Sequence, residues 1–114
     1  MTRFCKKNRI QVRFYDTVSD EMVRSGEVYL LLNSQLNSQL NQLVHTATDK
    51  GYEIGRDISI ISYNDAPFNE LVLGGLTTVS ADFAEMGRIA ADMILDNCQE
   101  KVKCDFRMVR RKTF

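Results

Sequence analysis

The pattern of apolar and polar positions divides the chain into short elements that alternate between strand and helix. Residues 28–32 and 58–61 are apolar runs of strand length without polar alternation, which is typical of strands covered on both faces of a parallel sheet. Residues 10–15 alternate apolar and polar side chains, and this predicts a strand with one buried face. The same alternation in residues 102–109 predicts a final strand.

Helical periodicity fills the stretches between these strands. From residue 36 to residue 47 the apolar side chains fall on one face, and Gly51 follows where a left-handed C-cap belongs. Residues 83–98 carry an apolar stripe, and residues 82–85 have the form of a capping box. Shorter helical segments are predicted at residues 1–8 and 17–25.

This order of elements predicts an α/β fold with a mainly parallel sheet and flanking helices. A chain of 114 residues is about one domain long and can bury one modest core. Residues 67–79 are interpreted as the connection between the strand at residues 58–61 and the long helix that follows.

Polar residues directly follow two of the apolar runs. Asn64 and Asp65 come after the strand at residues 58–61, and Asn33 comes after the strand at residues 28–32. In open α/β sheets ligands bind beyond the carboxyl ends of the strands, so these side chains are candidates for a binding site. Asn and Asp also suit a plain strand-ending turn, and both interpretations stay open on the sequence alone.

Composition excludes several classes of partner. Fifteen basic and fifteen acidic residues cancel to a net charge of zero, so no global field attracts nucleic acid or anionic lipid. Basic residues gather only between residues 107 and 112. A solvated strand edge or tail is the favoured explanation of that run, and a phosphate contact is the alternative.

The residues that usually carry catalysis or hold metals are sparse. The three cysteines lack a C-x-x-C spacing, and the single His45 has no second histidine with which to share a metal. No glycine-rich phosphate loop follows a strand, and no nucleophile is placed with a base. We expect no catalytic residues, no metal and no cofactor, and therefore no enzyme. No membrane span or export signal is present, so a cytoplasmic location is expected.

Four motifs taken together resemble the effector-binding domain of the lactose-repressor (LacI/GalR) family of transcriptional regulators. They are GRDISIISYND at residues 55–65, LTTV at 76–79, EMGRIAA at 85–91 and MVRRKT at 108–113. The resemblance implies a periplasmic-binding-protein-like fold, with these residues forming part of its C-terminal lobe. It assigns the chain to a lobe core (1–76), a crossover and helix that complete the N-terminal lobe (77–101), and a returning strand with a basic tail (102–114).

The resemblance also implies a function. Members of this family bind a small effector, usually a sugar, form homodimers, and contact DNA through a helix-turn-helix headpiece that has no counterpart in these residues. It places Asn64 at the effector, with Asp65 beside it, and Asn33 as a second contact for which Asn37 is the competing alignment. The family usually has Asp where this chain has Asn64, and Pro where it has Gly75.

Two expectations follow from the missing N-terminal lobe. The apolar stripe of residues 83–98 either folds back on the core or packs against a second copy of the chain. The expected function is an effector-sensing and dimerising fragment of a transcriptional regulator. The alternative is a stand-alone module that binds a small solute.

Overall fold

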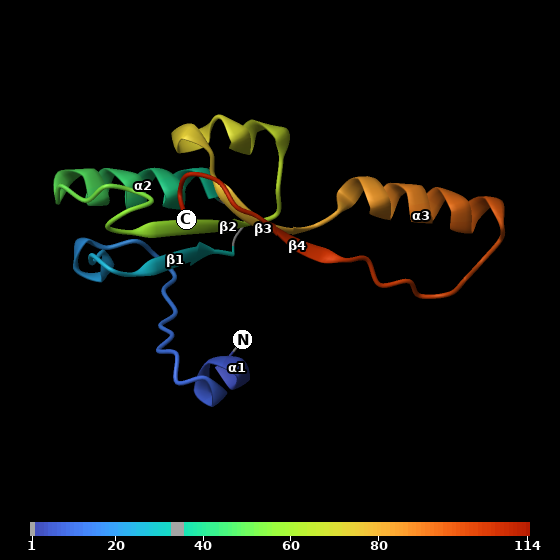
Figure 1. Cartoon of the computed structure of the whole chain (residues 1–114), viewed down its shortest axis with the longest axis horizontal. Helices are drawn as coiled ribbons and strands as arrows, with labels where there is room; N and C mark the ends of the chain where they lie inside the picture. Colours follow the sequence, from blue (N-terminus) through green and yellow to red (C-terminus); the bar gives the residue numbers. More distant parts are fainter. Residues whose placement is uncertain (1, 33–35) are drawn as a thin grey trace.

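The sheet is the centre of the structure, a computed structural model that describes residues 2–32 and 36–114. Its four strands lie side by side in chain order (Figure 1). The first three are parallel, and the last is antiparallel to its neighbour. The mainly parallel α/β fold is therefore confirmed. The strands are β1 (Val28–Leu31), β2 (Ser59–Tyr63), β3 (Thr77–Ala81) and β4 (Phe106–Val109).

The third strand corrects the interpretation of residues 67–79 as a connection only. The connection itself contains two 3₁₀ turns, Pro67–Glu70 and Val72–Gly74, and β3 begins directly after it. Thr77, Thr78 and Val79 are all β-branched, which favours a strand, but the run is too short to stand out beside a glycine-rich loop.

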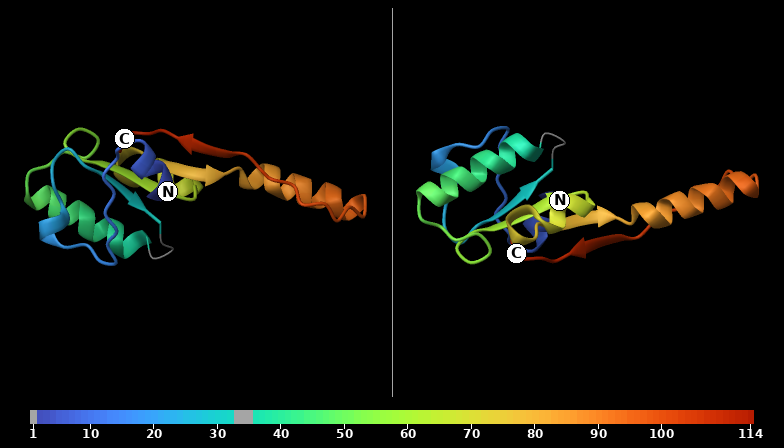
Figure 2. Two further views of the ribbon diagram at one scale, coloured as in Figure 1. Left: turned by 90° about the horizontal axis from the view of Figure 1, so that it is seen from below. Right: turned by 90° about the horizontal axis from the view of Figure 1, so that it is seen from above.

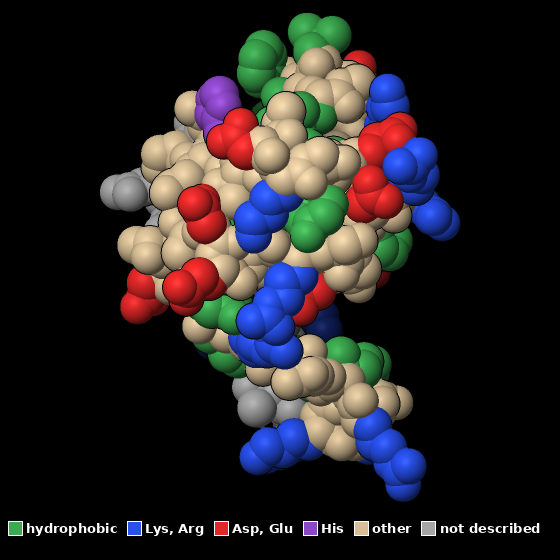
Figure 3. Space-filling view, turned by 90° about the vertical axis from the view of Figure 1, so that its left-hand side faces the viewer, with side chains coloured by type: hydrophobic (Ala, Val, Ile, Leu, Met, Phe, Trp, Pro, Cys, Tyr) green, Lys and Arg blue, Asp and Glu red, His purple; other side chains and the backbone are tan. Residues whose placement is uncertain are grey.

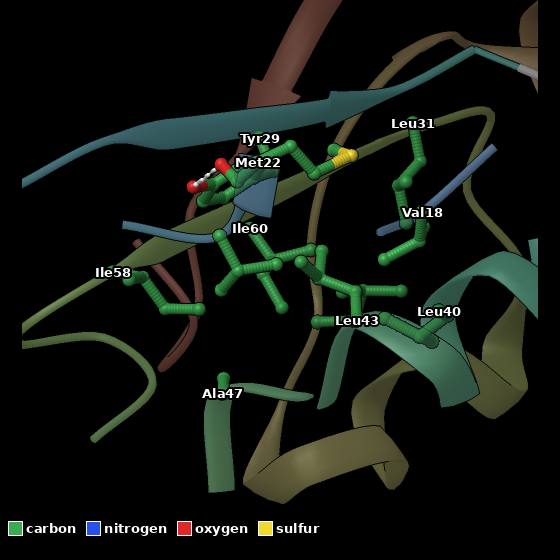
Figure 4. Packing of buried hydrophobic residues seen from close by; sticks show 11 residues of the cluster. Val18, Met22, Tyr29, Leu31, Leu40, Leu43, Ala47, Ile58 and Ile60 are labelled. Atoms are coloured by element: carbon green, nitrogen blue, oxygen red, sulfur yellow. Dashed lines mark hydrogen bonds between the residues drawn. The ribbon is translucent and has the colours of Figure 1, made fainter. Parts of the chain in front are cut away.

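The hydrophobic core lies between the sheet and helix α2 (Leu36–Asp49). Figure 4 shows Leu43 and Ala47 of α2 facing Ile58, which directly precedes β2, and Ile60 within β2. These four side chains are almost completely buried, because alternate residues of the strand point to the helix-covered face. The predicted helix and its C-cap at Gly51, which has a φ of 75°, are both confirmed.

The N-terminal part differs most from the sequence prediction. Residues 10–15 form no strand and lead into a bend at Asp16 and Thr17. The predicted short helix is reduced to one 3₁₀ turn, Asp20–Met22. The first helix, α1 (Thr2–Lys7), lies apart from the sheet and is connected to it by the residues that follow (Figure 1). The alternating pattern had indicated a strand, but a strand also needs a neighbouring strand with which to exchange hydrogen bonds. In the described chain no strand pairs with residues 10–16.

The C-terminal residues lock β2 to β3. Thr113 Oγ1 accepts a hydrogen bond from the Thr77 amide and donates one to the Ile60 carbonyl, both at 2.8 Å. The Ile60 amide in turn donates to the Thr113 carbonyl at 2.8 Å. The chain end therefore stabilises the point at which the two parallel strands begin to pair.

Helix α3 (Phe83–Leu95) projects away from the sheet (Figures 1 and 2). Its predicted start is confirmed, because the Asp82 side chain accepts a hydrogen bond from the Glu85 amide at 3.0 Å. None of its residues is buried, so the expectation that this helix folds back on the core is wrong. Its packing against a second copy stays a prediction.

Candidate functional site

The candidate site is the edge of the sheet at which the parallel strands end. Leu31 of β1 lies opposite Ser62 of β2, and Tyr63 lies opposite Val79 of β3, so the three strands end close to one another. Asn64 follows β2 with an exposed side chain and a left-handed φ of 69°. The backbone N–H of Asn64 donates to the Val79 carbonyl at 2.9 Å. Asn tolerates this conformation better than most residues, which explains why it can end the strand here.

Asp65 is held by an arginine from the far end of the chain. The Arg111 guanidinium donates through both terminal nitrogens, one to each carboxylate oxygen of Asp65, and both distances are 3.0 Å. Asn69 Nδ2 approaches the same carboxylate at 3.4 Å. The Arg111 side chain is only 15% exposed and that of Asp65 27%, so water screens this pair less than a surface ion pair.

This pairing changes the acidity of both groups. The hydrogen bonds from Arg111 lower the pKa of Asp65 below its ordinary value, against the opposing effect of partial burial, and the Asn69 amide lowers it further. The same contact raises the pKa of Arg111. The buried Thr78 hydroxyl lies near enough to add to the lowered pKa of Asp65, but it makes no hydrogen bond of normal geometry with the described residues. Asp65 is therefore a carboxylate at neutral pH.

The structure brings two of the three predicted site residues together. Asn64 and Asp65 lie at the carboxyl edge, as the sequence predicted, whereas Asn33 lies outside the described residues. The competing Asn37 belongs to the first turn of α2, and its side chain is also outside the described part. The sequence analysis missed Arg111 and Asn69, which donate hydrogen bonds to Asp65. Arg111 lies 46 positions from Asp65, and nothing in the local sequence points to a partner at that distance. Asn69 lies only four positions away, but the pattern of the loop does not show that its side chain turns back to Asp65.

The basic run near the C-terminus is largely occupied by internal contacts. Arg107 lies 3.5 Å from the Asp82 carboxylate. Arg110 lies over the Phe114 ring, 5.1 Å from its centroid, and donates to the Phe114 carbonyl. With Arg111 bound to Asp65, these contacts support the structural explanation of the run. Figure 3 shows acidic and basic side chains intermixed on one end of the molecule, in keeping with a net charge of zero.

Two other kinds of site were sought in the part of the chain that the structure describes. No three His, Cys, Asp or Glu residues there come close enough to hold a metal ion. None of the helices in that part is both long and apolar enough to cross a membrane.

The fold and its edge define the class of α/β lobes that carry polar groups beyond the carboxyl ends of a parallel sheet. Residues 35–112 match the model of the periplasmic binding protein-like domain family, and the chain belongs to that family. It is 32% identical over 71 residues to the lactose operon repressor of Escherichia coli (strain K12). The matched region covers 58% of this chain and 20% of the repressor. The resemblance to the lactose-repressor family is thereby confirmed.

Solved structures agree with this assignment. The Lac repressor bound to ONPG matches with a TM-score of 0.55 and 26% identity, over 76% of this chain and 27% of that one. A transcription regulator-like protein from Staphylococcus haemolyticus matches 99% of this chain and 44% of its own, with a TM-score of 0.70 and 18% identity. A LacI family regulator from Lactobacillus casei with bound glucose has a TM-score of 0.56 and 17% identity over 76% of this chain and 32% of its own. The last two show a shared fold only.

Proposed function

We propose that this chain is the effector-sensing and dimerising part of a cytoplasmic LacI-type transcriptional regulator. The observation that carries the proposal is the pair of polar side chains, Asn64 and Asp65, placed beyond a buried parallel strand in a chain of this family. The effector is a small sugar-like molecule. DNA is contacted only through a headpiece outside these 114 residues.

The chemistry of the edge suits hydroxyl groups. The Asn64 amide offers both a donor and an acceptor, and its side chain is exposed. A carboxylate has about four acceptor positions, and Arg111 and Asn69 use three of those on Asp65. One acceptor position is left for a ligand hydroxyl beside Asn64. In this proposal Asn33 supplies a further amide from the end of β1.

A single edge does not enclose a sugar. Pockets for small molecules bury most of the ligand surface, whereas this edge is one wall of such a pocket. The parts that this chain matches are 27% and 32% of two Lac repressor structures, so the rest of those chains leaves room for an opposing lobe. We place the second wall of the effector pocket on that opposing lobe, so that the effector binds between the two lobes and shifts their arrangement.

Calorimetry with a panel of sugars, beginning with glucose, galactose and lactose, tests this proposal. The titration is performed on this chain and on a longer protein that adds the opposing lobe. We expect saturable binding only to the longer protein. Binding to this chain alone would favour the stand-alone solute-binding module, and no binding to either protein would count against a sugar effector.

The Asn64→Ala variant of the longer protein tests the role of the edge. It should weaken sugar binding about tenfold, which corresponds to one lost hydrogen-bonding group at about 1.4 kcal/mol. The matched control is Asn41→Ala, which removes an exposed amide from α2. Equal thermal melting of both variants excludes unfolding as the cause, and an unchanged affinity in Asn64→Ala would remove Asn64 from the site.

A further inference from the structure

The side chain of Asn64 is placed at the candidate site by its backbone alone. It is exposed and makes no hydrogen bond with another described residue. The backbone of Asn64 has a left-handed φ of 69°, and its N–H donates to the Val79 carbonyl at 2.9 Å. Such a backbone at a residue other than glycine persists only where the surrounding structure holds it. The direction of this side chain therefore depends on what fixes the chain before and after it.

Arg111 supplies the fixed point after Asn64. Its guanidinium donates to both carboxylate oxygens of Asp65 at 3.0 Å and to the Leu76 carbonyl at 2.7 Å. The backbone N–H of Arg111 donates at 2.8 Å to the hydroxyl of Thr77, which is completely buried. A planar guanidinium fits such a set of acceptors because its donors lie in a rigid fork. One side chain thus ties the residue after Asn64 to the start of β3.

Gly75 leaves room for this contact. A Cβ added there would lie 3.0 Å from the Arg111 Cβ, which is closer than ordinary packing allows. Gly75 also has a φ of 128°, a value that favours glycine. Proline, which the lactose-repressor family usually has at this position, is fixed near −65° and cannot adopt it. Glycine therefore allows the close approach of Arg111 that this structure shows.

We propose that Arg111 is the positioning residue of the candidate effector edge. By binding both oxygens of Asp65, it holds Asn64 in its left-handed conformation and keeps the Asn64 amide at the carboxyl edge of the sheet. Asn69 cannot replace it, because Asn69 belongs to the same loop as Asp65 and reaches the carboxylate only at 3.4 Å. The role in binding rests on the effector proposal, whereas the hold on the loop does not.

Hydrogen exchange of this chain, followed by NMR, tests the hold on the loop. In Arg111→Gln the Asn64 amide should exchange at least about tenfold faster, while the Leu43 amide in the middle of α2 stays within about threefold. The matched control is Arg110→Gln, because this neighbouring side chain contacts only Phe114 and is exposed. The control should leave Asn64 unchanged within about twofold. An unchanged Asn64 amide in Arg111→Gln, or equal acceleration of Asn64 and Leu43, would overturn the proposal.

Arg111→Lys tests the paired hydrogen bonds and stays informative if the glutamine variant does not fold. Lysine keeps the positive charge, but its single ammonium group cannot reproduce the planar contact with both oxygens of Asp65. We expect the Asn64 amide to exchange at least about threefold faster than in the wild type. Exchange at the wild-type rate would show that charge alone holds the loop and would contradict positioning by the paired hydrogen bonds.

Sugar binding by the longer protein separates positioning from general support. The probe is whichever of glucose, galactose and lactose binds the wild type. Arg111→Gln should weaken its binding about tenfold, as Asn64→Ala does. Because Arg111 acts through Asn64, the double variant should bind within about twofold of Asn64→Ala. A further tenfold loss would show independent effects and overturn the proposal. If none of the three sugars binds the wild type, the sugar proposal fails, and the exchange rates still decide the role of Arg111.

Discussion

At the scale of single residues, the pair of Asp65 and Arg111 links the candidate site to the end of the chain. Arg111 also donates to the Leu76 carbonyl at 2.7 Å, so one guanidinium ties the loop after β2 to the start of β3. The motif around Arg111 was noted in the sequence, but its partner lies 46 positions away. Local patterns carry no information about such a contact, because it forms only when the strands have paired.

Asp65→Asn tests this pair. The variant leaves the largely buried Arg111 without its charged acceptor, and we expect a loss of about 2 kcal/mol in the free energy of unfolding. Urea unfolding at neutral pH measures it. The matched control is Asp92→Asn, which breaks an exposed pair with Arg88 on α3 and should cost no more than about 0.5 kcal/mol. Equal costs would show that burial adds nothing to the pair.

The pH dependence of the same variant supplies a second check. Because the folded pKa of Asp65 lies below that of the unfolded chain, about 3.9, its contribution is complete above about pH 5 and is lost as the pH falls through the folded pKa. The stability difference between wild type and Asp65→Asn should therefore shrink below about pH 4. A difference that stays constant down to pH 2 would contradict the lowered pKa.

Gly55 allows the chain end to approach the turn before β2. It has a φ of 93°, and a Cβ added there would lie 2.3 Å from the Lys112 carbonyl oxygen. Gly26 has a similar φ of 83° but no atom within 4 Å of such a Cβ. We expect Gly26→Ala to cost about 1 kcal/mol of unfolding free energy through backbone strain alone, and Gly55→Ala to cost about 2 kcal/mol more. Thermal or urea unfolding compares them, and equal losses would contradict the close approach.

At the scale of elements, the sequence predicted what local patterns determine. The cap at Asp82, the apolar face of α2 and the strands β1 and β2 depend on residues within one or two turns of each other, and all appear close to their predicted places. Residues 10–15 show the limit of this approach. Their alternation is compatible with a strand, yet strand formation depends on a partner that the pattern does not contain.

In the candidate site, too, features set by the local sequence could be predicted, whereas features that depend on distant residues could not. The position of Asn64 and Asp65 just beyond a buried strand could be predicted, because strand and turn signals are adjacent in the sequence. The left-handed backbone of Asn64 and the occupied carboxylate of Asp65 could not, since both depend on β3 and on the C-terminal residues. The sequence therefore located the edge but not how much of it is free for a ligand.

At the scale of the whole molecule, the shape is extended. The radius of gyration is 17.1 Å, whereas a compact chain of this length has roughly 13 Å. The arm formed by α3 accounts for much of this extension (Figure 1). The sheet face opposite α2 is also uncovered: Tyr63, Phe106 and Met108 are exposed there, and the Tyr63 and Phe106 rings lie 5.6 Å apart. Parallel sheets are normally covered on both faces, so a single copy leaves much apolar surface in water.

Helix α3 gives the most specific test of the proposed dimer. Its apolar stripe includes Phe83, Met86 and Ile94, all exposed in the single chain. A helix of 13 residues with so few contacts is only marginally stable alone, and pairing of two stripes would stabilise it. Ile94 lies in the stripe, whereas Leu95, one residue further, is turned by about 100° to the other side of the helix.

Ile94→Gln and Leu95→Gln form a matched pair, because the two side chains are 80% and 81% exposed in the single chain. If two copies pair through the stripe, Ile94→Gln should raise the dimer dissociation constant at least about tenfold, since each copy loses the burial of an aliphatic side chain. Leu95→Gln should leave that constant unchanged within about twofold. Sedimentation equilibrium measures both. A wild-type chain that stays monomeric at high concentration, or two variants that behave alike, would exclude pairing through this stripe and leave the uncovered sheet face as the surface to be tested next.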